Sequence, residues 1–142
     1  EIGAEVAWIE TEVFQGADGT GEQLDVVASI SALQQMGIKH IDLAGYSFGA
    51  WVNALAIDQC PYVRNMVMVS PPVGFVDFGL VNSISSLKLV VTGSMDDVAP
   101  ADRIKAMSPK WNPKALLKII PGADHFYSGC LDKLESVLSS YI

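Results

Sequence analysis

The sequence has 142 residues, of which half are hydrophobic and 18% are charged, and its net charge is −7. These values predict one globular domain with a substantial core and argue against an intrinsically disordered chain. The negative charge argues against nucleic acid and anionic membrane surfaces as partners, and no apolar run is long enough to cross a bilayer. We therefore expect a soluble, cytoplasmic protein.

The sequence predicts neither a metal site nor an organic cofactor. Cys60 and Cys130 lack the spacing of metal ligands and are too few for a disulfide framework, so we expect ordinary thiols. Residues 15–21 are rich in glycine but lack the Gly-Lys-Ser/Thr ending of a phosphate-binding loop. This segment is therefore interpreted as a turn.

Residues 1–14 fit two patterns. Ile2, Val6, Ile9 and Val13 recur at helical spacing, whereas alternate residues from Ala7 onward follow the spacing of a strand. Both interpretations stay open at this point.

A helix is predicted after the glycine-rich segment, with Gly37 ending it. Glu22 and Asp25 are expected in its first turn, where acidic side chains interact favourably with the helix dipole. The residues expected on its apolar face are Val26, Val27, Ile30, Leu33 and Met36.

Four apolar runs alternate with helical or loop segments in the rest of the chain. They are residues 39–44, 63–69, 87–92 and 115–120. This pattern predicts an α/β fold, with a mostly parallel open sheet and helices on both faces. A last helix is expected from about residue 130 to 139. The residues expected to face inward from it are Leu131, Leu134, Val137 and Leu138.

The run Gly-Tyr-Ser-Phe-Gly at residues 45–49 lies between the first of these strands and a helical segment. A strand, a sharp turn and a helix are the setting of a nucleophile elbow, which exposes the hydroxyl of its serine. We expect Gly45 and Gly49 where a side chain would collide with the turn or the helix. Ser47 is the candidate nucleophile, and the backbone N–H of Phe48 is a candidate oxyanion-hole donor.

An acidic pair and a histidine follow two later strands. Asp96 and Asp97 come after residues 87–92, and His125 comes after residues 115–120. Ligands of parallel sheets bind beyond the carboxyl ends of the strands, so these side chains are expected near Ser47. A serine needs an imidazole to take its proton, and the imidazole needs a carboxylate to orient it. The other histidine, His40, opens a strand at its opposite end.

Several motifs together make the chain from Gly16 onward resemble the α/β-hydrolase superfamily, especially its small lidless bacterial branch near dienelactone hydrolases and acyl esterases. The motifs are Gly-x-Gly-Glu-x-x-Asp at 19–25, Ala-Gly-Tyr-Ser-Phe-Gly-Ala at 44–50, Ser-Pro-Pro at 70–72, Gly-x-x-Asp-x-Val-x-Pro at 93–100 and Pro-Gly-Ala-Asp-His-Phe at 121–126. The family's carboxylate lies four residues before the proline of the acid loop. The resemblance therefore implies a triad of Ser47, His125 and Asp96.

The sequence also departs from this family. A His-Gly or His-Pro loop ahead of the elbow normally gives a second oxyanion donor, and residues 1–45 contain no such pair. We therefore expect a single α/β-hydrolase domain over residues 1–142 that is truncated at its N-terminus and has impaired activity. The strand at 39–44 would then lie at an edge of the sheet, where it could pair with residues 1–14 or with a second copy of the chain.

The interpretation is a serine hydrolase that cleaves carboxylic esters or related acyl bonds of small molecules through an acyl-enzyme. A short chain with no room for a lid before residue 87 favours small or exposed acyl substrates. Pro71, Pro72, Phe75 and Phe78 fit an apolar wall near the site as well as ordinary loop packing. Two alternatives remain: a catalytically silent domain used for binding or assembly, and a peptide, thioester or lactone hydrolase on the same triad.

Overall fold

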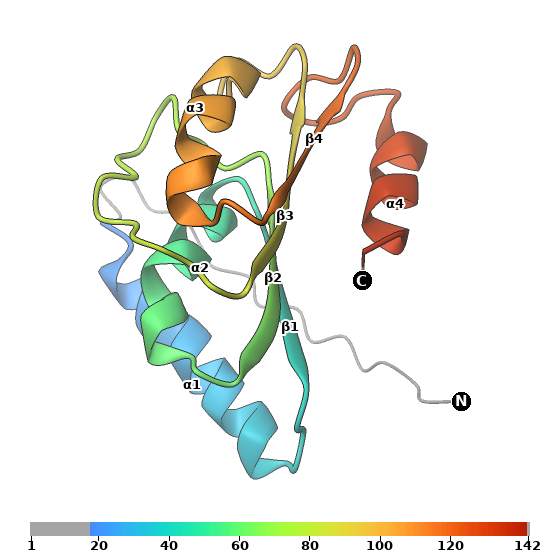
Figure 1. Cartoon of the computed structure of the whole chain (residues 1–142). Helices are drawn as coiled ribbons and strands as arrows, with labels where there is room; N and C mark the ends of the chain where they lie inside the picture. The colour runs from blue at the N-terminus through green and yellow to red at the C-terminus, as the bar shows by residue number, and fades with distance from the viewer. Residues whose placement is uncertain (1–17, 142) are drawn as a thin grey trace.

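The computed structural model describes residues 18–141, which form a four-stranded parallel sheet with helices on both faces (Figure 1). The strands lie side by side in chain order and are β1 (Ile41–Tyr46), β2 (Val63–Val69), β3 (Leu87–Gly93) and β4 (Leu116–Ile120). Helices α1 (Thr20–Gln35), α2 (Phe48–Ala56) and α3 (Ala101–Trp111) cover one face, and α4 (Leu131–Ser139) covers the other. A short 3-10 helix, η1 (Ile57–Gln59), follows α2. The predicted α/β class is confirmed.

The side chains of β2 alternate between two hydrophobic cores, one on each face of the sheet. Successive side chains of a strand point to opposite faces, so Met66 and Met68 pack with α1, α2 and α3, whereas Val67 and Val69 face α4. All four side chains are buried. Residues 66–69 of β2 are therefore all apolar, without alternating polar residues, because both faces of the sheet are covered, as the sequence predicted.

Helix α1 begins earlier than the sequence suggested. The Asp18 carboxylate accepts the Thr20 N–H at 2.9 Å, and Gly19 adopts a φ of 79° just before the helix. The end of the glycine-rich segment thus forms the entrance to α1. Glu22 lies in the first turn as expected, but Asp25 lies beyond it.

Two predicted core residues are exposed because they lie at helix ends. Met36 is the residue that caps the C-terminus of α1, and it is 70% exposed. Gly37 follows with a φ of 88° and ends the helix as predicted. Leu131 opens α4 and is 65% exposed, because side chains tilt toward the helix N-terminus and this one extends past the helix start. Leu134, Val137 and Leu138 pack against the smaller core.

Strand β1 forms one edge of the described sheet. It begins at Ile41 rather than residue 39 and pairs with β2. Pairing between residues 1–14 and this strand, and the choice between helix and strand for that segment, fall outside residues 18–141. Association through this edge stays a prediction. Within residues 18–141, no helix combines the length and the apolar character that a membrane span requires.

Both cysteines are buried free thiols, as the sequence predicted. Cys60 belongs to the larger core and Cys130 to the smaller one. Burial raises the pKa of the Cys60 thiol above its ordinary value, which lowers its reactivity.

Candidate active site

Ser47 is the single residue between the end of β1 and the start of α2. Its backbone adopts φ 51° and ψ −123°, which a residue with a side chain rarely occupies, and its N–H donates to the Val69 carbonyl oxygen at 2.9 Å. Such strained conformations persist only where the surroundings impose them. The strand, the tight turn and the helix are those of the predicted elbow.

The two glycines of this turn differ in their surroundings. A Cβ atom on Gly45 would lie 2.6 Å from the Asn53 side-chain nitrogen and 2.7 Å from the Ala50 backbone nitrogen, so only glycine fits. A Cβ on Gly49 would meet no described heavy atom within 4 Å beyond its chain neighbours and the nearby backbone of α2. The predicted steric need for glycine therefore holds at Gly45, and at Gly49 it stays a prediction.

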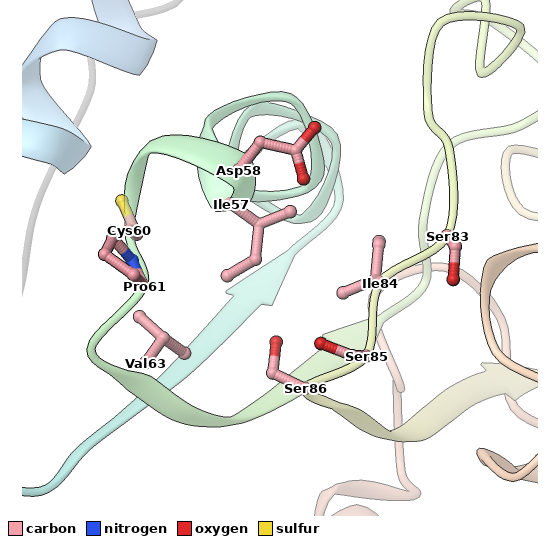
Figure 2. Close-up of a pocket in the computed structure, with 9 residues that line it drawn as sticks. All are labelled: Ile57, Asp58, Cys60, Pro61, Val63, Ser83, Ile84, Ser85 and Ser86. Carbon is pink, nitrogen blue, oxygen red and sulfur yellow. The ribbon is translucent and has the colours of Figure 1, made fainter.

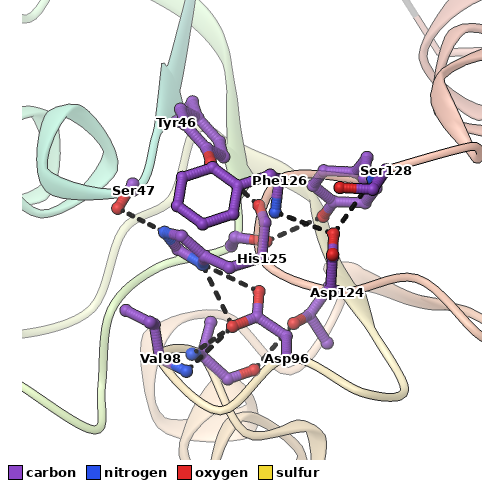
Figure 3. Close-up of polar contacts among 12 residues, drawn as sticks. Tyr46, Ser47, Asp96, Val98, Asp124, His125, Phe126 and Ser128 are labelled. Atoms are coloured by element: carbon purple, nitrogen blue, oxygen red, sulfur yellow. Dashed lines mark hydrogen bonds and ion pairs between the residues drawn. The ribbon is translucent and has the colours of Figure 1, made fainter.

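The structure brings Ser47, His125 and Asp96 together beyond the carboxyl ends of β1, β4 and β3 (Figure 3). Ser47 Oγ lies 2.8 Å from His125 Nε2. His125 Nδ1 lies 3.0 Å from each of the two carboxylate oxygens of Asp96. A continuous hydrogen-bonded chain thus links hydroxyl, imidazole and carboxylate, in the geometry that lets a histidine act as a base on a serine.

Asp96, and not Asp97, supplies the carboxylate. Asp96 is 4% exposed, and its Oδ1 also accepts the backbone N–H groups of Val98 at 2.9 Å and Ala99 at 2.7 Å. Asp97 is exposed. The loop after β3 therefore holds the Asp96 carboxylate in one orientation, with its charge compensated by three donors.

Hydrogen bonds connect the loop that carries Asp96 to the loop that carries His125. The Met95 N–H donates to the Ala123 carbonyl oxygen at 2.9 Å, and the Gly122 N–H donates to Ser94 Oγ at 2.8 Å. A Cβ on Gly93 would collide with the Ala123 carbonyl group. Sequence reasoning did not identify Gly93 as essential, because its neighbour lies thirty residues further along the chain.

Tyr46 directly precedes Ser47 and contacts the backbone of His125. Its hydroxyl donates to the His125 carbonyl oxygen at 2.8 Å, and the two rings lie 5.4 Å apart, centroid to centroid. Burial and the negative charges of Asp96 and Asp124 raise the pKa of Tyr46. Sequence reasoning missed this residue, although its place directly before Ser47 was a usable signal.

Tyr127 anchors the histidine loop from inside the protein. Its side chain is 1% exposed, and its hydroxyl lies 2.8 Å from Ser70 Oγ. Burial raises the pKa of Tyr127 to about 12. Ser70 and Tyr127 both have positive φ values, 47° and 54°, so two further loops at this edge of the sheet are locally strained. No sequence motif pointed to this pair.

Asp124 is a turn residue. Its Oδ1 accepts the N–H groups of Ser128 at 3.0 Å and Phe126 at 3.1 Å, and these hydrogen bonds, that of Ser128 most, hold its pKa below the ordinary value. The predicted apolar wall is mostly ordinary packing. Pro71, Pro72 and Phe78 are buried, whereas Phe75 is 75% exposed.

A cavity of about 210 Å³ lies at the end of the sheet opposite to Ser47 (Figure 2). It is lined by Ile57, Asp58, Cys60, Pro61, Val63, Ser83, Ile84, Ser85 and Ser86. Val63 begins β2 and Ser86 directly precedes β3, so the cavity lies at the amino ends of these strands. It is therefore separate from the cluster around Ser47.

Comparison by sequence identifies a relative that is itself uncharacterised. No protein-family model matches the chain. The chain is 27% identical over 135 residues to RP471 of Rickettsia prowazekii (strain Madrid E), an uncharacterised protein, and the match covers 88% of this chain and 57% of RP471.

Solved structures give the more specific likeness. An α/β serine hydrolase homologue from Coxiella burnetii is 30% identical, with a TM-score of 0.77 over 92% of this chain and 62% of that one. XC6422 from Xanthomonas campestris, an α/β serine hydrolase without a lid, is 26% identical, with a TM-score of 0.79 over 93% and 60%. The chain is related to the α/β-hydrolase superfamily.

A third α/β-hydrolase neighbour is ATU1826 from Agrobacterium tumefaciens, a protein of unknown function assigned to this class provisionally. It is 25% identical, with a TM-score of 0.80 over 94% of this chain and 64% of that one. The chain thus spans less than two thirds of the length of RP471 and of these three solved structures. The predicted resemblance to the superfamily is confirmed.

Proposed function

We propose that this chain carries the reactive residues of a serine hydrolase that cleaves carboxylic esters or related acyl bonds. The observation that carries the proposal is the hydrogen-bonded chain from Ser47 Oγ through His125 to Asp96, with distances of 2.8 and 3.0 Å. The likeness to lidless α/β serine hydrolases supports the same reaction class.

Each residue has one role in the proposed reaction. His125 Nε2 accepts the hydroxyl proton of Ser47 while Oγ attacks the carbonyl carbon, and Asp96 orients the ring and stabilises the imidazolium. The tetrahedral intermediate then collapses, the bond to the alcohol breaks, and the alcohol takes the proton from Nε2. Water repeats these steps on the acyl-enzyme, which releases the acid and restores Ser47.

The N–H of Phe48 is the proposed oxyanion donor. Phe48 is the first residue of α2, so its N–H has no acceptor within the helix, and the helix dipole favours negative charge there. Residues 1–45 contain no His-Gly or His-Pro pair to add a second donor.

A fluorophosphonate probe, which labels activated serines, tests the proposal. The folded chain is expected to be labelled, Ser47→Ala is expected to lose all labelling, and Ser83→Ala at the far edge of the sheet is expected to keep it. Labelling in a folded Ser47→Ala variant, or none in the folded parent chain, would contradict the proposal. The second result would favour the silent binding domain. Comparison of esters with thioesters, lactones and peptides would then identify the bond that is cleaved.

A further inference from the structure

One exposed aromatic ring lies against the proposed base. Phe126 directly follows His125, and the two rings meet edge to face, with centroids 5.5 Å apart and planes at 82° (Figure 3). Phe126 is nevertheless 75% exposed. Tyr46 also contacts the imidazole, with centroids 5.4 Å apart, and it is 45% exposed. The surface next to His125 is therefore aromatic and open to solvent.

The loop holds Phe126 in this exposed position. On one side, the Asp124 carboxylate accepts the Phe126 N–H at 3.1 Å. On the other side, Tyr127 is buried and its hydroxyl is hydrogen-bonded to Ser70. Because both neighbours are fixed, the loop cannot easily turn the Phe126 ring into the core. An apolar group that binds to such an exposed side chain removes apolar surface from water, which is favourable.

The position of this surface indicates which part of a substrate reaches it. In ester cleavage, the departing alcohol takes its proton from His125 Nε2, so its oxygen must come within hydrogen-bond reach of that atom. The substituent of the alcohol must then lie beside the imidazole, where the Phe126 and Tyr46 rings are. Asp96 and Asp124 are close enough for their charges to raise the pKa of Tyr46, so an anionic substituent would be repelled.

We propose that Phe126 and Tyr46 form the binding surface for the alcohol part of the substrate and select esters whose alcohol carries a planar apolar group and no negative charge. This proposal rests on the proposed function, because it needs the ester to react at Ser47. In this arrangement the two rings make the structure of the leaving alcohol, and not only acyl length, a determinant of kcat/KM.

The test compares benzyl acetate, methyl acetate and 4-carboxybenzyl acetate as substrates. The ratio of kcat/KM for benzyl to methyl acetate is expected to fall about tenfold in Phe126→Ala, a change that corresponds to about 1.4 kcal/mol. Phe126→Leu, which keeps an apolar side chain without the plane, is expected to give an intermediate ratio. 4-Carboxybenzyl acetate is expected to react more slowly than benzyl acetate in the parent chain.

The matched control is Tyr62→Ala. Tyr62 is 60% exposed and directly precedes β2, at the amino end of the sheet, so its loss is expected to leave the ratio unchanged. Each ratio is measured within one variant, which cancels the active fraction of the sample. The comparison of ratios between variants cancels the intrinsic reactivity of the esters. An unchanged ratio in folded Phe126→Ala, with Ser47 still labelled, would overturn this inference alone. No hydrolysis and no labelling of the parent chain would overturn the proposed function and this inference together.

Discussion

Tyr46 and Ser47 are consecutive residues that contact different parts of the same histidine. The Tyr46 hydroxyl holds the His125 carbonyl oxygen at 2.8 Å, and Ser47 Oγ lies 2.8 Å from the ring nitrogen Nε2. The tip of β1 therefore fixes both the backbone and the side chain of His125. Tyr46 is a positioning residue in this arrangement, since its hydroxyl acts through the histidine.

Tyr46→Phe removes this hydroxyl and keeps the ring. We expect kcat to fall about fivefold, the loss expected for one hydrogen bond worth about 1 kcal/mol, with KM nearly unchanged. Steady-state kinetics on a fixed ester measures both constants. Tyr62→Phe is the control. A change in KM alone would contradict a positioning role.

The acidic pair after β3 allows a second comparison between neighbours. Asp96→Asn is expected to lower kcat by about 10³–10⁴, because an amide cannot stabilise the imidazolium and can favour the wrong tautomer. The asparagine oxygen can still accept the Val98 and Ala99 N–H groups, so the loop is expected to keep its shape. Asp97→Asn is expected to change kcat less than twofold, since Asp97 is exposed. Similar effects of the two changes would contradict the assignment.

At the scale of the elements, the site depends on how closely the loops after β3 and β4 approach each other. Gly93, the last residue of β3, has no room for a Cβ beside the Ala123 carbonyl group. This contact sets how the Asp96 loop lies against the His125 loop. Nearby, the Ser94 N–H donates to the Ile120 carbonyl oxygen at 3.0 Å.

Gly93→Ala tests this contact. We expect the free energy of unfolding to fall by about 1–3 kcal/mol or more, because the added methyl group overpacks a site bounded by backbone. Fluorophosphonate labelling of Ser47 is expected to slow as well, since the two loops must move apart. Urea unfolding and labelling rates measure the two effects. Gly21→Ala is the control and is expected to be neutral or stabilising, because a Cβ there meets no described heavy atom within 4 Å beyond its chain neighbours and the nearby backbone of α1.

The sequence predicted the elements and the candidate residues better than it predicted their surroundings. The four strands were found because apolar runs are local signals, and the elbow was found because a strand, glycines and a helix follow one another. The exposure of Met36 and Leu131 was not predicted, because periodicity gives the face of a helix but not where the core ends. Tyr127 and Gly93 were missed because their partners lie far away in the sequence.

At the scale of the whole molecule, buried polar groups connect the two cores to the loops around the site. Thr92 Oγ1 donates to the Ala99 carbonyl oxygen at 2.7 Å, and Ser70 pairs with Tyr127. Every buried side-chain nitrogen and oxygen of residues 18–141 has a hydrogen-bond partner. Because unsatisfied polar groups are costly, these pairs link the loops of the site to global stability.

Tyr127 makes this link measurable as alkaline unfolding. Its pKa is about 12 in the folded chain, against an ordinary value of 10.0. Below pH 10 the phenol is protonated in both states. Between pH 10 and 12 the unfolded chain releases this proton while the folded chain retains it, so stability is expected to fall with rising pH. Urea unfolding between pH 9 and 11.5 is expected to show this fall.

Tyr127→Phe is the comparison for that measurement. This variant is expected to start from a lower stability, because the buried Ser70 hydroxyl loses its partner, and to decline less steeply between pH 10 and 12. Tyr62→Phe is the control, because Tyr62 is exposed. Equal pH slopes in Tyr127→Phe and the parent chain would show that Tyr127 does not cause the decline.

The hydrogen bonds between the Asp96 loop and the His125 loop also affect how far these residues fluctuate relative to each other. Asp96 and His125 lie on loops joined by two backbone hydrogen bonds and by the Gly122–Ser94 hydrogen bond, so they are expected to move together. The turn of Ser47 is joined to the His125 backbone through the Tyr46 hydroxyl. The Asp96–His125 distance is then expected to vary less on heating than the Ser47–His125 distance.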